Sequence, residues 1–250
     1  LPSRASMLTG RYLFEHGAFE NKQRMRDGEI TFPEVFRDAG YNTVHIGKHH
    51  AGKPPQAVWE SSGSFKDIFG ATAPKDVPFR PELFANAINL GYEQNCGNPN
   101  HILAATYPGP VESTKSFHLA QLAMNWIYRN TDPRPFLLRV SFDDPHPPIA
   151  PPEPFYSMYD PHSLPDDLFT GVKESLEAKP AIIREYREWH GDAPITEEDH
   201  RKHAAAYLGL CSHVDAQIGR ILDYFERSEF AENTLIVFNS DHGHMIGEHG

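Results

Sequence analysis

Three loop segments, far apart along the chain, hold the residues best suited to chemistry. In the first, Lys48, His49 and His50 follow a predicted strand and lie between Gly47 and Gly52. A lysine can pair with a tetrahedral oxyanion, and a histidine can carry a proton to a leaving oxygen. The alternative is a solvated basic turn. The segment is therefore a candidate for anion binding and proton transfer.

The second segment runs from Asp143 to Pro148 with the sequence DDPHPP. Prolines on both sides would fix the imidazole of His146, which is useful in catalysis, although a structural histidine bonded to the backbone is the commoner case. Asp143 and Asp144 could be mistaken for paired metal ligands, but an aspartate before proline often simply begins a turn. His146 is therefore a candidate for the site with a structural histidine as the alternative, and a metal pair at Asp143 and Asp144 is not expected.

The third segment begins with Asp241 and His242, directly after an apolar run. A carboxylate beside an imidazole can supply oxygen and nitrogen ligands to Ca²⁺, Mg²⁺ or Mn²⁺. The alternative is a polar turn, because an Asp-His-Gly triplet is a weak motif. His244 and His249 lie nearby without cysteine or histidine partners at zinc-site spacing, so we expect them to be loop residues.

Arg4 lies in the first turn of a helix predicted from Pro2 to Thr9. The start of a helix offers free N–H groups and a positive partial charge, both of which favour an anion. A residue just before Pro2 would lie where a sulfate or phosphate group could be held. Arg4 is therefore a fourth candidate for the site.

The elements that must position these residues follow from hydrophobic spacing and from capping and turn signals. Helices are predicted at Pro2 to Thr9, Thr31 to Ala39, Ser116 to Tyr128 and Glu197 to Arg227, with a possible short helix around Pro81 to Asn89. Strands are predicted at Tyr41 to Ile46, Phe136 to Phe142 and Leu235 to Phe238. The segments 52–110 and 161–194 show weak periodicity and are expected to be excursions beside the site.

Helix followed by strand recurs three times, which favours an α/β fold with a mostly parallel sheet flanked by helices. In such sheets ligands bind at the carboxyl ends of the strands. The three loops that leave the predicted strands are Gly47 to Gly52, Asp143 to Pro151 and Asp241 to Gly250. Their convergence predicts one composite site, without naming a reaction.

Composition narrows the function classes. The 250 residues allow one α/β domain, and a formal net charge of −11 with a pI of about 5.7 argues against nucleic acid as the main partner. A metal and a few cations can still reverse the local field for an anionic substrate. No apolar run approaches the roughly 18 residues of a membrane span. Two cysteines allow one disulfide or none, so the cysteine count does not indicate whether the protein works in an oxidising or a reducing compartment.

The motifs, taken together, resemble those of the sulfatases in the alkaline phosphatase-like superfamily. Leu1 to Arg4 is similar to the end of C/S-x-P-S-R, whose first residue is oxidised to formylglycine. Residues 40–43 are similar to the family's G-Y-x-T, residues 46–52 to its G-K-x-H-x-G, and residues 145–148 to its P-H-x-P. Residues 240–243 and 247–250 are similar to its later metal strand and the loop that follows. The order and spacing agree over nearly the whole chain.

The resemblance implies a role for each matching position. The nucleophile would be a formylglycine, made from Cys or Ser, at the residue preceding Leu1. Arg4 would hold its hydrate, and Lys48 and His50 would contact the formylglycine and the sulfate. His146 would bind the sulfate or protonate the leaving oxygen.

The resemblance also implies a metal site. Asp241 and His242 would be two ligands of a divalent cation, calcium before magnesium or manganese. The family's acidic pair would lie upstream of Leu1 and a further lysine beyond Gly250. We therefore expect residues 1–250 to be the central part of a catalytic domain, truncated at both ends and inactive as given.

The same resemblance implies partners and location. The substrate would be a small-molecule or carbohydrate sulfate ester, shaped by insertions at 53–110 and 161–194. A formylglycine-generating or anaerobic maturation enzyme would act on the chain. A periplasmic or secreted location is expected, with any leader lying upstream.

Two alternatives stay open. A phosphonate monoester or phosphodiester hydrolase of the same superfamily would share these motifs, because sulfate and phosphate esters are nearly isosteric. A non-catalytic carbohydrate-binding relative would require that the residue before Leu1 be neither Cys nor Ser.

Overall fold

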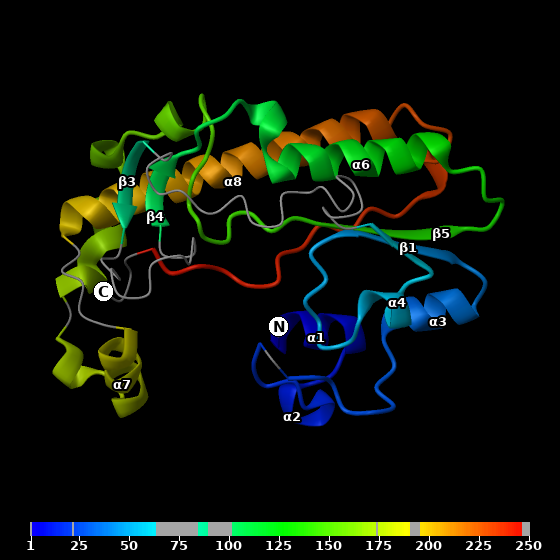
Figure 1. Ribbon diagram of the computed structural model, residues 1–250, viewed down its shortest axis with the longest axis horizontal. Helices are drawn as coiled ribbons and strands as arrows, with labels where there is room; N and C mark the ends of the chain where they lie inside the picture. The colour runs from blue at the N-terminus through cyan, green and yellow to red at the C-terminus, as the bar shows by residue number, and fades with distance from the viewer. Residues whose placement is uncertain are drawn as a thin grey trace. The chain divides into compact units, whose positions relative to one another are not determined.

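The computed structural model describes residues 2–21, 23–63, 85–89, 102–173, 175–190 and 196–246 (Figure 1). The chain divides into two compact units. The first unit consists of residues 1–75, 115–143 and 218–243, and the second of residues 76–114, 144–217 and 244–250.

The first unit is built on a three-stranded sheet with the order β2-β1-β5, from Ser61–Gly63, Asn42–Gly47 and Phe136–Ser141. Both pairings are parallel, and the register places Gly47 beside Ser141. The two longer strands therefore end side by side. The predicted parallel sheet and its first two strands are confirmed.

Helices cover this sheet. In the first unit they are α1 (Pro2–Thr9), α2 (Leu13–His16), α3 (Phe32–Asp38), α4 (Pro55–Val58), α6 (Lys115–Arg129), the last turns of α8 (Glu197–Phe225) and the short 3₁₀ helix η10 (Ala231–Asn233). The four long helices predicted from the sequence are confirmed to within two residues at each end. At α3 the predicted capping box forms, since the Thr31 N–H donates to Glu34 Oε2 at 3.0 Å.

One face of the sheet packs against α6, which lies on that side of β1 and β5 (Figure 1). Val44 and Ile46 of β1 pack there with Leu119 and Ala123 of α6. These helical residues are four positions apart, so they lie on one stripe of the helix. The amphipathic pattern read from the sequence therefore faces the sheet.

The opposite face packs against α1 and α4. Leu8 and Val58 are buried there with Trp59, and the ring of His45 stacks on the indole at a centroid distance of 5.2 Å. His45 is beside Arg139 in the β1–β5 register, so both side chains belong to this face. A polar, basic row therefore runs under α1.

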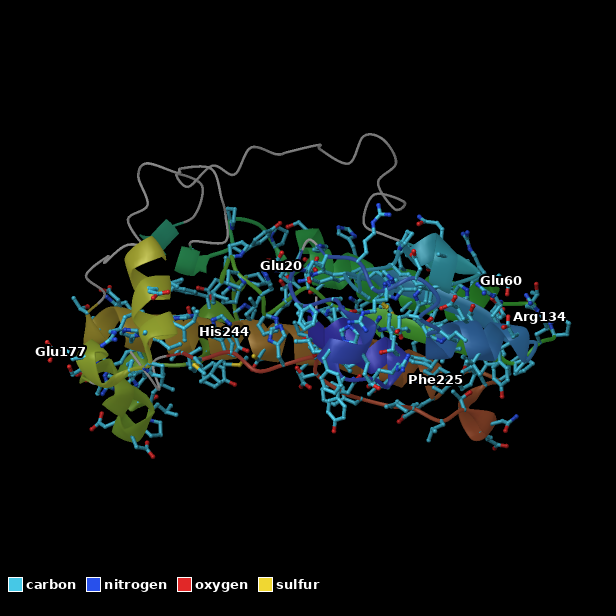
Figure 2. All side chains as sticks on the ribbon, turned by 90° about the horizontal axis from the view of Figure 1, so that it is seen from below. Glu20, Glu60, Arg134, Glu177, Phe225 and His244 are labelled. Carbon is cyan, nitrogen blue, oxygen red and sulfur yellow. The ribbon has the colours of Figure 1, made fainter. Side chains whose placement is uncertain are left out.

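The amino end of β5 is held by charges at the surface. Arg134 contacts Glu60 at 2.8 Å and Asp132 at 2.6 Å, and Glu60 and Arg134 lie close together in Figure 2. Exposed pairs of this kind contribute little to stability individually. They lie at the end of β5 opposite to the loop that carries Asp143.

In the second unit a two-stranded antiparallel sheet forms between β3 (Ala85–Asn89) and β4 (Ile102–Thr106). The short helix predicted around Pro81 to Asn89 is therefore wrong for residues 85–89, and residues 81–84 lie outside the described part. Local propensity in this stretch is weak, and pairing with β4 decides its structure.

Helices complete the second unit. They are the 3₁₀ helices η5 (Val111–Ser113), η6 (Tyr156–Met158), η7 (Pro161–Ser163), η8 (Asp166–Lys173) and η9 (Leu176–Ala178), with α7 (Ala181–His190) and the first part of α8. The 3₁₀ turns fit the irregular segment predicted at 161–194, whereas α7 was not predicted. Ile149 is fully buried against Ala104, Ala206 and Leu210.

The third predicted strand is wrong. Residues 234–240 have no regular secondary structure, and Leu235, Val237 and Phe238 are 87%, 74% and 79% exposed. A strand needs a hydrogen-bonded neighbour, and in the described residues this run pairs with none of the sheet strands. Strand propensity alone cannot supply that partner.

The expectations on membrane spans and on cysteines can be compared with the described residues. Within the described ranges no helix is both long and apolar enough to cross a bilayer. Cys211 is a free thiol, and Cys96 lies outside the described residues.

Replacing Gly47 by alanine should destabilise the protein strongly. Gly47 has φ = 102°, and a Cβ there would collide with the Ser141 carbonyl. Chemical denaturation should show a loss of at least about 2 kcal/mol in the free energy of unfolding. Gly10→Ala is the matched control, because Gly10 has φ = 67° with open space around it. An equal or smaller loss at Gly47 would contradict the close approach.

Candidate active site

Arg4 is the centre of a buried polar cluster in the first unit. Its side chain is 8% exposed, and its Nε donates to Asp241 Oδ2 at 2.6 Å. Its Nη1 donates to the Lys48 carbonyl and to Ser141 Oγ, both at 2.7 Å. One guanidinium therefore joins a helix start, two strand ends and the segment that follows α8.

Parallel pairing explains why these groups meet. The ladder between β1 and β5 continues past Gly47, because the Lys48 N–H donates to the Ser141 carbonyl at 2.9 Å. The loops leaving the two strands therefore start from neighbouring points. Of the predicted site residues, the structure brings Arg4, Lys48 and Asp241 together.

Asp241 is held as a carboxylate. Partial burial works to raise the pKa of Asp241, but the charge of Arg4 and its hydrogen bond outweigh this effect and lower the pKa below its usual value. The backbone of Asp241 is also held, since Ser3 Oγ donates to its carbonyl. The carboxylate of Asp241 therefore stays negative when it faces Arg4.

His242 is more exposed than Asp241. Its side chain is 66% exposed, and its Nε2 is 3.9 Å from Asp241 Oδ2. The pair offers one carboxylate and one imidazole on the same side, which suits a divalent cation that accepts oxygen and nitrogen. In the described ranges no group of three or more metal-binding side chains is present. The two donors fit part of a metal site.

His50 follows in the loop after β1 and is exposed, with φ = 42°. It is the only non-glycine residue in the described chain with positive φ, a strained conformation that is often found at functional sites. Partial burial, followed by nearby positive charges that include Lys48 and Arg4, lowers the pKa of His50. The neutral imidazole, which can accept a proton, is thereby favoured.

His146 belongs to the second unit. It is exposed, and its Nδ1 is 2.7 Å from the Pro147 carbonyl. Its loop is free of helix and strand, as predicted. The contacts around Arg4 do not include His146, so its role stays a prediction. His244, predicted to be a loop residue, is in a loop of the same unit and stacks on Tyr207 at a centroid distance of 5.3 Å.

A second ion-pair cluster lies at the same sheet edge. Lys48 Nζ is 3.5 Å from Asp143 Oδ1, and Lys115 contacts Asp143 Oδ2. Asp143 therefore lies between two ammonium groups. The expectation that Asp143 and Asp144 are not a metal pair stays a prediction.

Under α1 the basic row is kept largely neutral. Burial, then the charge of Arg139, lowers the pKa of His45 to about 3 and that of His49 to about 4. Burial, with Arg4 nearby, also lowers the pKa of Arg139 to about 10, although Asp241 opposes this shift. Arg139 thus carries the positive charge of the row, while both histidines are neutral.

Several residues of this region were not among the predicted site residues. Ser141 and Lys115 touch the cluster but carry no motif of their own. Arg139 is a charged residue inside the apolar run of β5, and that interruption was a signal for a polar environment beneath the site. Asp143 was dismissed as a turn residue, although its place just after a parallel strand pointed to the edge where Lys48 lies.

A parallel sheet with cationic side chains at its carboxyl edge defines a class of α/β proteins that hold anionic groups at strand ends. A sequence model of the sulfatase family matches residues 1–250, and the chain belongs to that family. An arylsulfatase of Clostridium perfringens is 34% identical, over 100% of this chain and 54% of that protein. Sulfatases in general depend on a divalent metal and a formylglycine.

Two solved structures are similar in fold. The phosphonate monoester hydrolase of Agrobacterium radiobacter has a TM-score of 0.72 and 21% identity, covering 99% of this chain and 54% of that one. A protein solved with its substrate D-glucosamine-2-N,6-O-disulfate has a TM-score of 0.63 and 22% identity, covering 100% and 57%. These likenesses confirm the predicted alkaline phosphatase-like fold. The chain spans about half the length of the relatives it matches.

Stability should fall as the pH decreases below about 6.5. The folded state keeps His45 neutral down to about pH 3, whereas the unfolded chain takes up a proton near 6.5, so unfolding is favoured in that window. The stabilisation is complete above pH 6.5. Each such histidine contributes up to about 1.4 kcal/mol per pH unit.

Urea midpoints measured at pH 7 and pH 5 would test this dependence. His45→Phe, which keeps a ring against Trp59, should reduce the difference between the two midpoints. A variant with the same pH dependence as the wild type would contradict the burial of a neutral His45.

Proposed function

We propose that the full protein hydrolyses sulfate esters. The supporting observation is the cluster around Arg4, whose guanidinium reaches Asp241 and the Lys48 carbonyl, 237 and 44 positions away in the chain. A buried charge is retained only when its partners are held in place, so these contacts support an anion site at this edge of the sheet. Membership of the sulfatase family supplies the reaction class.

Each candidate site residue has a proposed role in sulfate ester hydrolysis. Lys48 would stabilise negative charge on the sulfuryl oxygens. His50, with its lowered pKa, would accept a proton at the attacking side, and His146 would bind the sulfate or give a proton to the leaving oxygen. Arg4 would hold the nucleophile, expected as a formylglycine immediately before Leu1, while it also orders Asp241.

A divalent cation would be held by Asp241 and His242 together with ligands from elsewhere in the full protein. Calcium is the proposed ion on the resemblance to other sulfatases, with the Asp241 carboxylate as the kind of oxygen ligand that a hard cation prefers. When bound, the cation would stabilise charge on the sulfuryl oxygens. Asp241, kept ionised by Arg4, is suited to this role.

We propose a sulfated carbohydrate as the substrate. Support comes from a protein of similar fold that was solved with a glucosamine disulfate. The segments 53–110 and 161–194 would shape the substrate side. On the resemblance to other sulfatases, we also propose maturation by a formylglycine-generating or an anaerobic maturation enzyme, and a periplasmic or secreted location.

The full-length protein should turn over an aryl sulfate faster than an aryl phosphonate or a phosphodiester. The test is kcat/KM on the three chromogenic esters at equal pH and metal concentration. Turnover of the phosphorus esters alone would favour the related phosphonate monoester hydrolase activity. Turnover of none, with sulfated sugar still bound, would favour the non-catalytic binding protein.

Lys48→Ala and His146→Ala in the full-length protein should each lower kcat/KM by about two to four orders of magnitude. The melting temperature should change little, because both side chains are partly or fully exposed. Lys202→Ala is the matched control, since Lys202 forms an exposed ion pair with Glu198 on α8. Near-normal turnover in either variant would remove that residue from the proposed site.

A further inference from the structure

Lys48, Asp143 and Lys115 form a charge triad at the carboxyl edge of the sheet. Lys48 Nζ approaches one carboxylate oxygen of Asp143 at 3.5 Å, and Lys115 contacts the other. The side chains of Lys48, Asp143 and Lys115 are 21%, 24% and 43% exposed. The triad is therefore half-sheltered from solvent, and its interactions are stronger than those of a fully exposed ion pair.

The topology of the first unit produces this triad. Lys48 is the first residue after β1, and Asp143 is the second after β5. Lys115 is the first residue of α6, the helix that precedes β5 and packs against the sheet. In a parallel crossover the helix runs back along the strands, so its start lies at their carboxyl ends. Three elements of one β-α-β unit thus each contribute one charge.

The charges decide what the triad can do. A carboxylate paired with Lys48 alone would cancel its charge and weaken its attraction for an anion. With Lys115 on the other carboxylate oxygen, the three side chains together keep one net positive charge. Asp143 can then restrict the position of the Lys48 ammonium without neutralising the edge.

We propose that Asp143 is a positioning residue for Lys48 and that Lys115 is a further cation that determines the affinity of this edge for an anionic ester. The inference rests on the proposed function for the identity of the ester. It does not rest on a metal, because two ammonium groups against Asp143 compete with any cation for its oxygens. Asp143 therefore acts through Lys48, and Lys115 acts through its charge.

The test uses the full-length protein with four variants. Asp143→Asn should lower kcat about 10- to 100-fold, because a misplaced Lys48 loses its alignment with the developing charge. KM should stay equal or fall, since the edge gains net positive charge. Asp143→Glu should recover part of kcat. A purely structural role would instead lower the melting temperature and give no such split between kcat and KM.

Lys115→Met should change KM and leave kcat nearly unchanged, which is the opposite of Asp143→Asn. KM for an anionic ester should rise about 5-fold, with kcat within about 2-fold of wild type, because one unit of charge is removed without moving Lys48. The double variant Asp143→Asn with Lys115→Met restores the net charge of the triad, so its KM should return toward wild type while kcat stays low.

Two controls match these changes. Asp132→Asn removes a carboxylate from the ion pairs at the opposite end of β5, and Lys202→Met removes an exposed lysine on α8. Both should leave kcat and KM unchanged. The proposal is overturned if Asp143→Asn keeps kcat within about 2-fold of wild type, or if Lys115→Met leaves KM unchanged.

A binding measurement separates this proposal from the proposed function. If the wild type hydrolyses neither sulfate nor phosphorus esters, the function fails, and calorimetric titration with inorganic sulfate still tests the triad. Weaker sulfate binding by Lys115→Met than by the wild type would support the triad. Equal binding, or no binding by the wild type, would overturn it.

Discussion

A charged guanidinium buried between a helix and a sheet is stable only when partners surround it. Arg4 meets this condition with a carboxylate, a carbonyl and a hydroxyl, all within 2.7 Å. Arginine suits the position better than lysine, because its planar fork can reach several acceptors at once. Losing one charged partner would leave the other charge buried and uncompensated. The relative placement of α1, both strand ends and Asp241 therefore depends on this one side chain.

The parallel sheet supplies the second constraint. Since β1 and β5 end at the same level, the residues that follow Gly47 and Ser141 lie at the same carboxyl edge of the sheet. The close approach at Gly47 leaves no space for a side chain, which brings the backbone of Lys48 against β5. The candidate site residues thus lie where the backbones of β1 and β5 are in close contact, and α6 packs against the apolar face of the same strands.

Much of this arrangement could be predicted from the chain. The bounds of the helices α1, α3, α6 and α8 and of the strands β1 and β5 agree closely with the sequence, because periodicity and end signals such as the Thr31 capping box mark them. β3 could not be predicted, because its structure comes from pairing with a distant segment. The predicted strand at Leu235 to Phe238 fails for the converse reason, because its strong β-propensity finds no pairing strand among the described residues.

The candidate site divides in the same way. Arg4 and Lys48 were predicted from their places at element ends and Asp241 from a strand that does not form, yet Arg4 contacts both the Lys48 carbonyl and the Asp241 carboxylate. Asp143 and Lys115 were missed because their meaning lies in a contact between elements, which no local pattern records. His146 lies in the second unit, so its part in the site rests on its motif alone.

The exposed run at Leu235 to Phe238 has a consequence for handling the molecule. Four consecutive apolar residues with high β-propensity are 53% to 87% exposed, and they pair with no strand in the described ranges. Such a segment is a template on which other chains can add strands, and this is how aggregation and domain swapping begin. Self-association at this segment is therefore expected to increase with protein concentration.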